Sequence, residues 1–410
     1  MMVFSPVRPW HRWPGGVLWL RLVFMLARTL PSDDRKVAEL SFIHFLQFAI
    51  IRRIPNLGQP RERLRQPLLM FESNYNGSFG QYIDAFSSSL TRRMKIFWNS
   101  SYGFPGPQPV TPFKSYIRDN EYPVAHYYSA YHRASTTMIT SALALSKRLQ
   151  EFVLRAATLA PETFAGEYRR FLTHMEDADA RGPVTTRVSR LAAAWSAVRA
   201  LVARPPRLGG GSRSGRSYVI TLLTPIMPGS EAALRQHLEG LSSDESPLSK
   251  LPYVHVGRWV VIDQLKMGWE GAPSRPSRLK SQYLLFTASI TVPAEAEVSR
   301  EERYIQRLPE SFLHELRARI PEEVDAIWKH CRGYPGTSNP EHFVRYLADA
   351  RLESSLVYTG YPDVTVDEVR QALAARERLV AFARDHQGQR DAAELQKAYL
   401  KESSTWFPSR

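Results

Sequence analysis

The sequence contains almost no cysteine and lacks the short motifs that identify several enzyme classes. Cys331 is the only cysteine among 410 residues, which excludes an intramolecular disulfide and a multi-cysteine zinc site. No Walker loop, Gly-x-Gly-x-x-Gly fingerprint, nucleophile elbow or His-Glu-x-x-His motif is present. These absences argue against P-loop hydrolases, Rossmann-type nicotinamide enzymes, α/β hydrolases and zinc proteases of that type. We interpret Cys331 as a half-buried thiol without a catalytic role, and we expect no metal site.

Acidic residues are scarce over one long stretch. None lies between Arg181 and Arg216, and the whole chain has a formal net charge of +14. Such an excess favours anionic partners. However, no helix-turn-helix, RNA-binding strand signature or zinc-finger spacing occurs, so nucleic acid is disfavoured as a partner. The chain is 43% hydrophobic and 23% charged, which is typical of a folded protein.

The N-terminal region lacks the features of a membrane span or a cleaved signal. Its apolar run at 17–27 is too short to cross a bilayer, contains Arg21, and is followed by no Ala-x-Ala cleavage site. We interpret this run as the first amphipathic helix of the fold. The alternative is that the basic segment 1–40, with its tryptophans, contacts an anionic membrane surface. The expected localisation is cytoplasmic, either free or peripheral to a membrane.

What the sequence does contain is an internal repeat. Trp98–Gly106 and Trp328–Gly336 share the pattern Trp-x4-Gly-[Phe/Tyr]-Pro-Gly at an offset of 230 residues. The agreement continues without a gap over 55 positions, of which 15 are identical, including Tyr131 and Tyr361. This regularity indicates a duplicated unit. We interpret the motif itself as scaffold, an aromatic anchor at a helix end followed by a turn that needs glycine dihedrals.

The predicted elements follow a similar order in both copies. Apolar and β-branched runs predict strands at 41–54 and 67–73, and at 217–224, 252–265 and 282–288. Apolar stripes at helical spacing predict one helix over 83–97 and another over 313–327, with a kink or restart at Pro321. A loop, a short strand and a trailing helix complete each copy. The first copy lacks an opening strand, or has residues 17–27 in its place.

The second copy therefore has the order β-α-β-β-α-β of a ferredoxin-like unit. The predicted fold class is α+β, a tandem duplication of a ferredoxin-like βαββαβ unit that forms an intramolecular α/β barrel, with extra helices between the copies. The predicted organisation is a basic amphipathic segment at 1–40, a first unit at 41–155, a helical connector and linker at 156–216, a second unit at 217–387 and a helical tail at 388–410. The connector helices are expected at 162–175 and 187–203.

Two ferredoxin-like units in one chain resemble the dimeric α/β-barrel superfamily, in which two such sheets close face to face. That superfamily includes the dye-decolorising peroxidases, the chlorite-dismutase-like haem proteins and the cofactor-independent antibiotic-biosynthesis monooxygenases. The resemblance rests on element order and duplication over 40–155 and 217–385, and it implies an oxidoreductase with haem or with no cofactor. The Gly-x-x-Asp-Gly motif of the dye-decolorising enzymes is absent, and the most similar segment, Gly77–Asp84, does not match it. No haem ligand is therefore carried over to any residue.

Two histidines occupy equivalent positions in paired strands. His44 and His255 could act as bases or anchor a ligand, and Arg258 stands where the first copy has Gln47. We predict His44, His255 and Arg258 as catalytic residues. The alternative is that each histidine is buried and hydrogen-bonded within its own sheet.

Four further residues are predicted to bind substrate. Glu72 and Asn74 lie in a polar run whose counterpart in the second copy is less polar. Tyr128 and Tyr358 occupy equivalent positions in the repeat, and a phenol combines an apolar face with a polar tip. The alternatives are a turn at Gly77 with local hydrogen bonds and an ordinary aromatic seam of the barrel.

Two functional hypotheses follow. The first is an oxidoreductase that acts on a hydrophobic small molecule, in a haem-dependent, peroxidase-like form or without haem. It predicts an open pocket of about 300–1,000 Å³. The second is a non-catalytic protein of the same fold that binds a ligand, a partner or a membrane surface. The oligomeric state is left open.

Overall fold

The structure is a computed structural model that describes residues 1–8, 16–29, 41–180, 212–214, 216–291 and 302–407. It divides into two compact units. Unit 1 comprises Met1–His132 and Arg187–Asp363, and unit 2 comprises Arg133–Thr186 and Val364–Arg410. Each unit is thus assembled from two separate stretches of the chain. The boundaries after His132 and after Asp363 fall inside the ranges 41–155 and 217–387, each of which was assigned from the sequence to a single unit.

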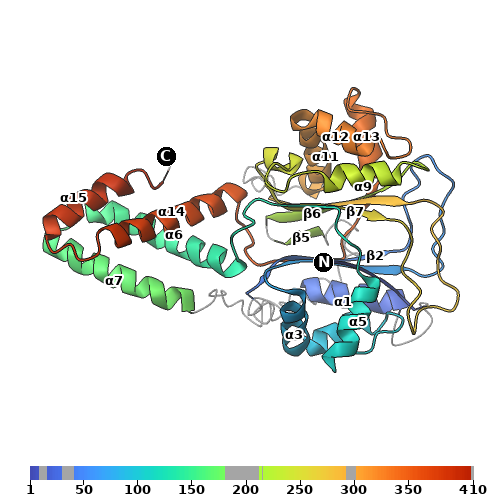
Figure 1. Cartoon of the computed structure of the whole chain (residues 1–410), viewed down its shortest axis with the longest axis horizontal. Coiled ribbons are helices and arrows are strands. Elements are labelled where there is room, and N and C mark those ends of the chain that lie inside the picture. Colours follow the sequence, from blue (N-terminus) through green and yellow to red (C-terminus); the bar gives the residue numbers. More distant parts are fainter. Residues whose placement is uncertain (9–15, 30–40, 181–211, 215, 292–301, 408–410) are drawn as a thin grey trace. The chain divides into compact units, whose positions relative to one another are not determined.

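Unit 1 contains two antiparallel sheets, with helices on their outer faces (Figure 1). The first sheet has the order β1-β3-β2-β10, with the bounds β1 Met2–Pro6, β2 Ile43–Ile51, β3 Leu68–Tyr75 and β10 Leu356–Thr359. The second has the order β4-β7-β8-β6-β5, with β9 paired to β6. Its bounds are β4 His126–Ser129, β5 Arg213–Ser214, β6 Ser217–Pro225, β7 Val254–Ile262, β8 Tyr283–Thr291 and β9 Arg351–Leu352.

The last strand of each half of the chain joins the sheet of the other half. β4 follows the first sheet in sequence but pairs with β7, and β10 follows the second sheet but pairs with β2. The order β6-β8-β7-β4 in one sheet therefore mirrors β1-β3-β2-β10 in the other. Because each sheet needs a strand from the other half, the two halves form one body.

The opening strand of the first half lies at the N-terminus, which corrects the prediction that this half lacks one. All five residues of β1 are buried, and the strand pairs with β3 along its whole length. Residues 17–27 do not replace this strand, since they belong to helix α1 (Gly16–Thr29). Val17, Leu20 and Phe24 are buried in the core below the first sheet, as expected for the first amphipathic helix of the fold. A five-residue strand that ends in proline gives too short an apolar pattern to be recognised.

Helices cover the two sheets on opposite sides of unit 1 (Figure 1). On one side lie α1, α3 (Phe79–Ser89), α4 (Thr91–Trp98) and α5 (Val110–Asn120); on the other lie α9 (Glu231–Glu239), α11 (Glu302–Arg319), α12 (Pro321–Trp328) and α13 (Pro340–Asp349). The predicted restart at Pro321 is confirmed. The single helix predicted over 83–97 is wrong because the chain breaks it at Leu90. The segments that contain α5 and α13 were predicted as loops, which is also wrong.

The repeated Trp-x4-Gly-[Phe/Tyr]-Pro-Gly motif begins at the last residue of a helix in each half and continues into a turn. The helix is α4 in the first half and α12 in the second. Trp98 and Trp328 are completely buried. Both glycines of each turn have positive φ, at Gly103, Gly106, Gly333 and Gly336. A side chain would strain these positions. The predicted aromatic anchor and the glycine dihedrals of the turn are thus both observed.

The described chain thus has a mixed α/β fold with antiparallel sheets and twelve α-helices. The strand pairings give two separate sheets, so the closed barrel predicted from the sequence is not seen among the described residues. The predicted strands at 41–54, 67–73, 217–224, 252–265 and 282–288 all occur with shifted ends.

Unit 2 is helical. It contains α6 (Thr136–Ala156), α7 (Pro161–Ala180), α14 (Val366–Asp385) and α15 (Ala392–Ser403) around an apolar core that includes Phe152, Phe382 and Tyr399. Helix α7 and the tail helix α15 confirm two sequence predictions, while the helix predicted at 187–203 lies outside the described residues. None of the helices in the described ranges is both long and apolar enough to cross a membrane.

Candidate functional site

The space between the two sheets of unit 1 is filled in layers that change from apolar to polar along the strands. Inward-facing positions recur at every second residue of a strand. At one end these positions carry Ala49, Met70, Val260 and Leu285, which belong to one apolar cluster. Two residues further along, the equivalent positions are all polar. Beyond them lie the two predicted histidines.

The central polar layer contains Gln47, Glu72, Asn74, Arg258 and Thr287, which we call the central polar cluster. Gln47 pairs with Glu72 in the first sheet, and Arg258 pairs with Thr287 in the second. In the repeat Gln47 corresponds to Arg258 and Glu72 corresponds to Thr287, so the two halves carry different side chains in this layer. The sheets therefore face each other with an acidic residue on one side and a basic residue on the other.

Glu72 and Arg258 form a buried ion pair between the sheets. Arg258 Nε lies 3.1 Å from Glu72 Oε1, and their side chains are 2% and 6% exposed, respectively. The same carboxylate oxygen accepts a hydrogen bond of 2.9 Å from Thr287 Oγ1, and the other accepts one from Gln47 Nε2. Arg258 also donates to Asn74 Oδ1 and to the carbonyl of Met1. Both charges are thus satisfied by the protein, which is what a buried pair requires.

The next layer brings His44, Tyr131, His255 and Tyr361 together, and we call it the His–Tyr quartet. The Tyr361 hydroxyl lies 2.9 Å from His44 Nδ1 and donates to the Tyr131 hydroxyl at 3.0 Å. The Tyr131 hydroxyl also lies 2.5 Å from His255 Nδ1. Each histidine bonds a tyrosine that follows a strand of its own sheet, and the two phenols link the sheets. All four side chains are less than 10% exposed.

β-bulges position both histidines. The pairing of β2 with β3 shifts between Ile43 and Phe45, and that of β7 with β8 shifts between Val254 and Val256. The residue inside each shift is the histidine. A bulge adds one residue to a strand and re-aims its side chain, which explains how His44 and His255 reach the same layer as the tyrosines.

Burial keeps both imidazoles neutral near pH 7. It lowers the pKa of His44 to about 4, partly offset by a hydrogen bond with the Asn76 side chain, which raises it. Burial, with a smaller contribution from His44, lowers the pKa of His255 to about 3. Burial raises the pKa of Tyr361 well above its usual value of 10. The quartet therefore contains two neutral phenols and two neutral bases within hydrogen-bonding distance.

The predicted site residues separate into two groups. His44 and His255 lie in the quartet, while Glu72, Asn74 and Arg258 lie in the adjacent central polar cluster. Tyr128 and Tyr358 lie in neither group, because the alternation of side chains along a strand places theirs on the outer, helix-covered faces of the sheets. Tyr128 is part of the core under the helices of the second sheet, and Tyr358 packs against the core of the first. The sequence analysis did not assign Tyr131 and Tyr361 to the site, although their identity in the repeat was the signal that could have identified them.

Two other features lie away from this site. Cys331 is fully buried rather than half-buried, its Sγ lies 3.2 Å from Thr224 Oγ1, and burial raises its pKa to about 12. A surface depression of about 660 Å³ lies between α12 and the second glycine turn, lined by Glu322, Asp325, Lys329, Tyr334 and Thr337, among others. It shares no lining residue with the quartet or the central polar cluster. No group of three or more metal-ligating side chains occurs in the described part of the chain.

Comparison with known proteins identified no relative: no protein-family model matches the chain, and no curated protein matches it significantly.

Proposed function

We propose that unit 1 is a tandem duplication of a ferredoxin-like unit, of the type found in the dimeric α/β-barrel superfamily. Three regularities support this proposal. The two sheets have corresponding strand orders, the two histidines lie in corresponding bulges, and the two Trp–Gly motifs close corresponding helices. The exchange of β4 and β10 supports the face-to-face arrangement of that superfamily.

We propose further that the protein is an oxidoreductase that acts on a hydrophobic small molecule, with the His–Tyr quartet as its redox-active centre. The observation that carries this proposal is the 3.0 Å hydrogen bond between two buried phenols, each of which also contacts a neutral imidazole. Phe45 packs 5.4 Å from the His255 ring and 5.5 Å from the Tyr361 ring, which makes the surroundings aromatic and apolar.

The chemistry follows from the proton positions. A phenol that gives one electron to an oxidant becomes strongly acidic and must lose its proton. At Tyr131, whose hydroxyl accepts from Tyr361 and faces His255, that proton passes to His255 Nδ1 at 2.5 Å, which leaves a neutral tyrosyl radical and an imidazolium. When a hydrophobic reductant returns one electron, the imidazolium returns the proton and Tyr131 is restored. Tyr361 supports this pair, because its hydroxyl donates to Tyr131 and lies 2.9 Å from His44 Nδ1.

Haem was the cofactor that the sequence resemblance implied, and the residues of the quartet do not fit it in this arrangement. Both ring nitrogens of His255 have partners, Tyr131 and Thr291, and His44 is bonded to Tyr361 and Asn76. Ligation of iron by either histidine would break one of these bonds. No proton or electron transfer in the quartet is therefore assigned to haem. Its binding is tested by adding haemin to the purified protein, where a Soret band would establish it.

The redox proposal is tested by freezing the protein after treatment with hexachloroiridate(IV), a one-electron oxidant, and recording its electron paramagnetic resonance spectrum. We expect a tyrosyl radical in the native protein and its loss when both Tyr131 and Tyr361 are replaced by Phe. Tyr399→Phe is the matched control, since Tyr399 is a completely buried tyrosine of unit 2. Equal radical yields in all three proteins would refute the assignment of the quartet.

The second hypothesis, a non-catalytic binding protein, is favoured by a different observation. Side chains bond directly across the gap between the sheets, with Gln47 Nε2 3.2 Å from Thr221 Oγ1 and Thr287 Oγ1 2.9 Å from Glu72. Polar groups that satisfy each other need no ligand. Under this hypothesis the quartet only joins the sheets, oxidation yields no specific radical, and added haemin gives no Soret band.

A further inference from the structure

Two long loops form one end of unit 1. Residues 52–67 connect β2 to β3, and residues 263–282 connect β7 to β8. Buried polar side chains fix the loops to each other. Gln66 Nε2 donates to the carbonyl of Arg275 at 2.8 Å, and Ser277 N donates to Gln66 Oε1 at 3.0 Å. Glu62 accepts hydrogen bonds from Lys280 N and from the Tyr283 hydroxyl. The surface that these loops carry is therefore fixed in shape.

Three arginines project from the first loop in a row. Arg61, Arg63 and Arg65 are exposed, whereas Glu62 and Gln66 between and beside them are 5% and 9% exposed and bond to the second loop. The alternation of exposed and buried residues places the three arginine side chains on the outer side of the loop. We call Arg61, Arg63 and Arg65 the arginine ladder.

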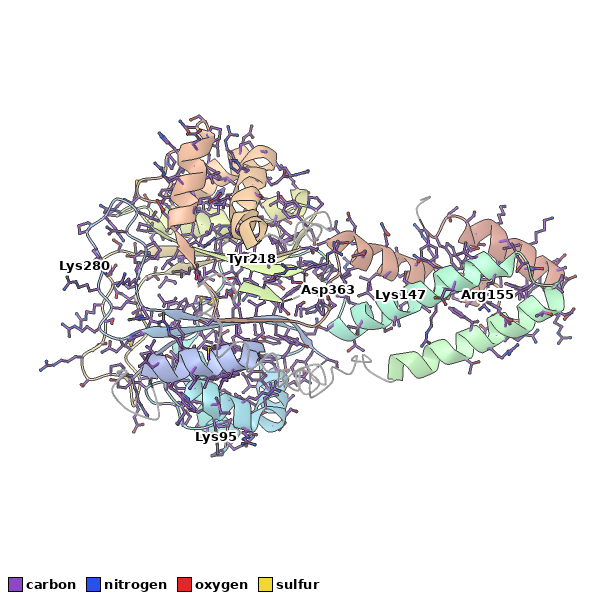
Figure 2. The ribbon with its side chains drawn as sticks, turned by 180° about the vertical axis from the view of Figure 1, so that it is seen from behind. Lys95, Lys147, Arg155, Tyr218, Lys280 and Asp363 are labelled. Atoms are coloured by element: carbon purple, nitrogen blue, oxygen red, sulfur yellow. The ribbon has the colours of Figure 1, made fainter. Side chains whose placement is uncertain are left out.

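The surroundings of the ladder are also basic. Six more exposed cations lie on the same two loops: Arg52, Arg53, Lys266, Arg275, Arg278 and Lys280 (Figure 2 labels Lys280). The exposed carboxylates there are only two, Asp263, which is paired with Arg235 at 3.0 Å, and Glu270. No ion pair involves the ladder within the described residues. The positive charge at this end of unit 1 is therefore not neutralised by the protein.

We propose that the arginine ladder binds the phosphate backbone of a single-stranded nucleic acid. Guanidinium groups bind phosphate through paired hydrogen bonds, and a regular row of them matches a linear polymer that repeats its phosphates. No large apolar side chain is exposed on either loop, both of which are fully described. A surface that inserts into a membrane interface would need such side chains.

This proposal does not depend on a known nucleic-acid motif. The sequence disfavours nucleic acid because it contains none of the familiar signatures. The ladder arises instead from the way that two loops, about 210 residues apart in sequence, lock together and turn their cations outward. Since neither loop has an exposed aromatic side chain to stack on bases, the expected binding is insensitive to base sequence.

The experiment measures binding of fluorescent oligothymidylate to the full-length protein across a series of salt concentrations. We expect the triple variant Arg61→Gln/Arg63→Gln/Arg65→Gln to bind at least about tenfold more weakly, with the slope of log K against log salt reduced by about 2. The matched control is Arg92→Gln/Arg148→Gln/Arg169→Gln, which removes the same charge from exposed arginines elsewhere and should bind like the native protein.

Several outcomes would overturn the proposal. Equal weakening in the two triple variants would mean that net charge alone drives binding. Binding of phosphatidylserine vesicles that depends on the ladder, without binding of oligothymidylate, would assign the surface to a membrane. A third variant, Arg61→Lys/Arg63→Lys/Arg65→Lys, separates charge from loss of structure. It should keep the salt slope because lysine keeps the charge. A slope as low as that of the glutamine variant, while its circular dichroism spectrum stays native, would refute a backbone contact made through charge.

Discussion

His44 and His255 are buried bases that the folded protein holds in the neutral form. The unfolded chain exposes both, and there they take up protons below the ordinary histidine pKa of 6.5. In the folded protein the same uptake occurs only near pH 4 for His44 and near pH 3 for His255. The unfolded state therefore binds more protons in this window, and folding stability must decrease as the pH falls through it.

We predict that the free energy of unfolding is fully retained above about pH 6.5 and falls below it, by up to about 1.4 kcal/mol per pH unit for each histidine. Urea unfolding at pH 7 and pH 5 measures this change. His255→Asn should reduce the dependence on pH relative to the native protein. His342→Gln, at an exposed position, is the control for removal of an imidazole as such. An unchanged dependence in His255→Asn would contradict the assignment.

The ion pair between Glu72 and Arg258 makes a second prediction. Glu72→Gln alone leaves the buried guanidinium without its counter-charge and should cost about 3–5 kcal/mol of unfolding free energy. Arg258→Met alone should cost a similar amount, since it leaves a buried carboxylate. The double variant should cost much less than the sum, because no charge remains buried. Denaturant titrations of the three variants form the cycle, and additive effects would show that the two charges do not interact.

The repeated glycine turns illustrate how equivalent elements differ in their packing. Gly103 and Gly333 occupy the same place in the motif and have φ of +60° and +72°. A Cβ at Gly103 would collide with the ring of Trp269 and lie 3.2 Å from the backbone of Gly271. A Cβ at Gly333 would have only ordinary contacts, with the carbonyl oxygen of Leu57 at 3.4 Å and Tyr346 Cε2 at 3.8 Å. The backbone conformation is shared, but the neighbours are not.

Alanine substitution should separate these two contributions. Gly333→Ala should lower the free energy of unfolding by about 1–2 kcal/mol, because alanine must adopt the left-handed backbone conformation. Gly103→Ala has the same effect and must also displace Trp269, so we expect it to lower the free energy of unfolding further, by about 1–3 kcal/mol more. Thermal or urea unfolding of both variants measures the difference. Equal losses would mean that the loop that carries Trp269 moves aside freely.

The whole molecule is interleaved rather than modular. β4 from the first half completes the second sheet, β10 from the second half completes the first, and unit 2 combines α6 and α7 with α14 and α15. Neither half of the chain contains a complete sheet or a complete helical unit. Folding therefore has to bring residues from both halves together.

Fragments test this interleaving. We expect residues 1–180 and residues 212–410, expressed separately, to lack cooperative unfolding, and we expect the two fragments to assemble when they are expressed together. Cooperative urea transitions monitored by circular dichroism, together with co-purification through a tag on one fragment, are the measurements. A single fragment that unfolds cooperatively on its own would show that the exchanged strands are dispensable.

The sequence by itself determined the local structure and the repetition. Alternating or continuous apolar runs predicted five of the strands, Pro321 predicted the break before α12, and the constant offset of 230 residues matched Trp98 to Trp328 and Tyr131 to Tyr361. These features depend on neighbours in the chain. β1 escaped detection because its pattern is only five residues long, and the break at Leu90 escaped because the apolar stripe continues across it.

Only the tertiary structure decided how these parts meet. The sequence marked His44, His255, Glu72, Asn74 and Arg258 one at a time, but the ion pair exists because Gln47–Glu72 of one sheet faces Arg258–Thr287 of the other. Two bulges and the exchange of β4 and β10 decided that each histidine contacts a tyrosine, and strand alternation turned Tyr128 and Tyr358 toward the helices instead. Such contacts join residues hundreds of positions apart, so no local pattern in the chain encodes them.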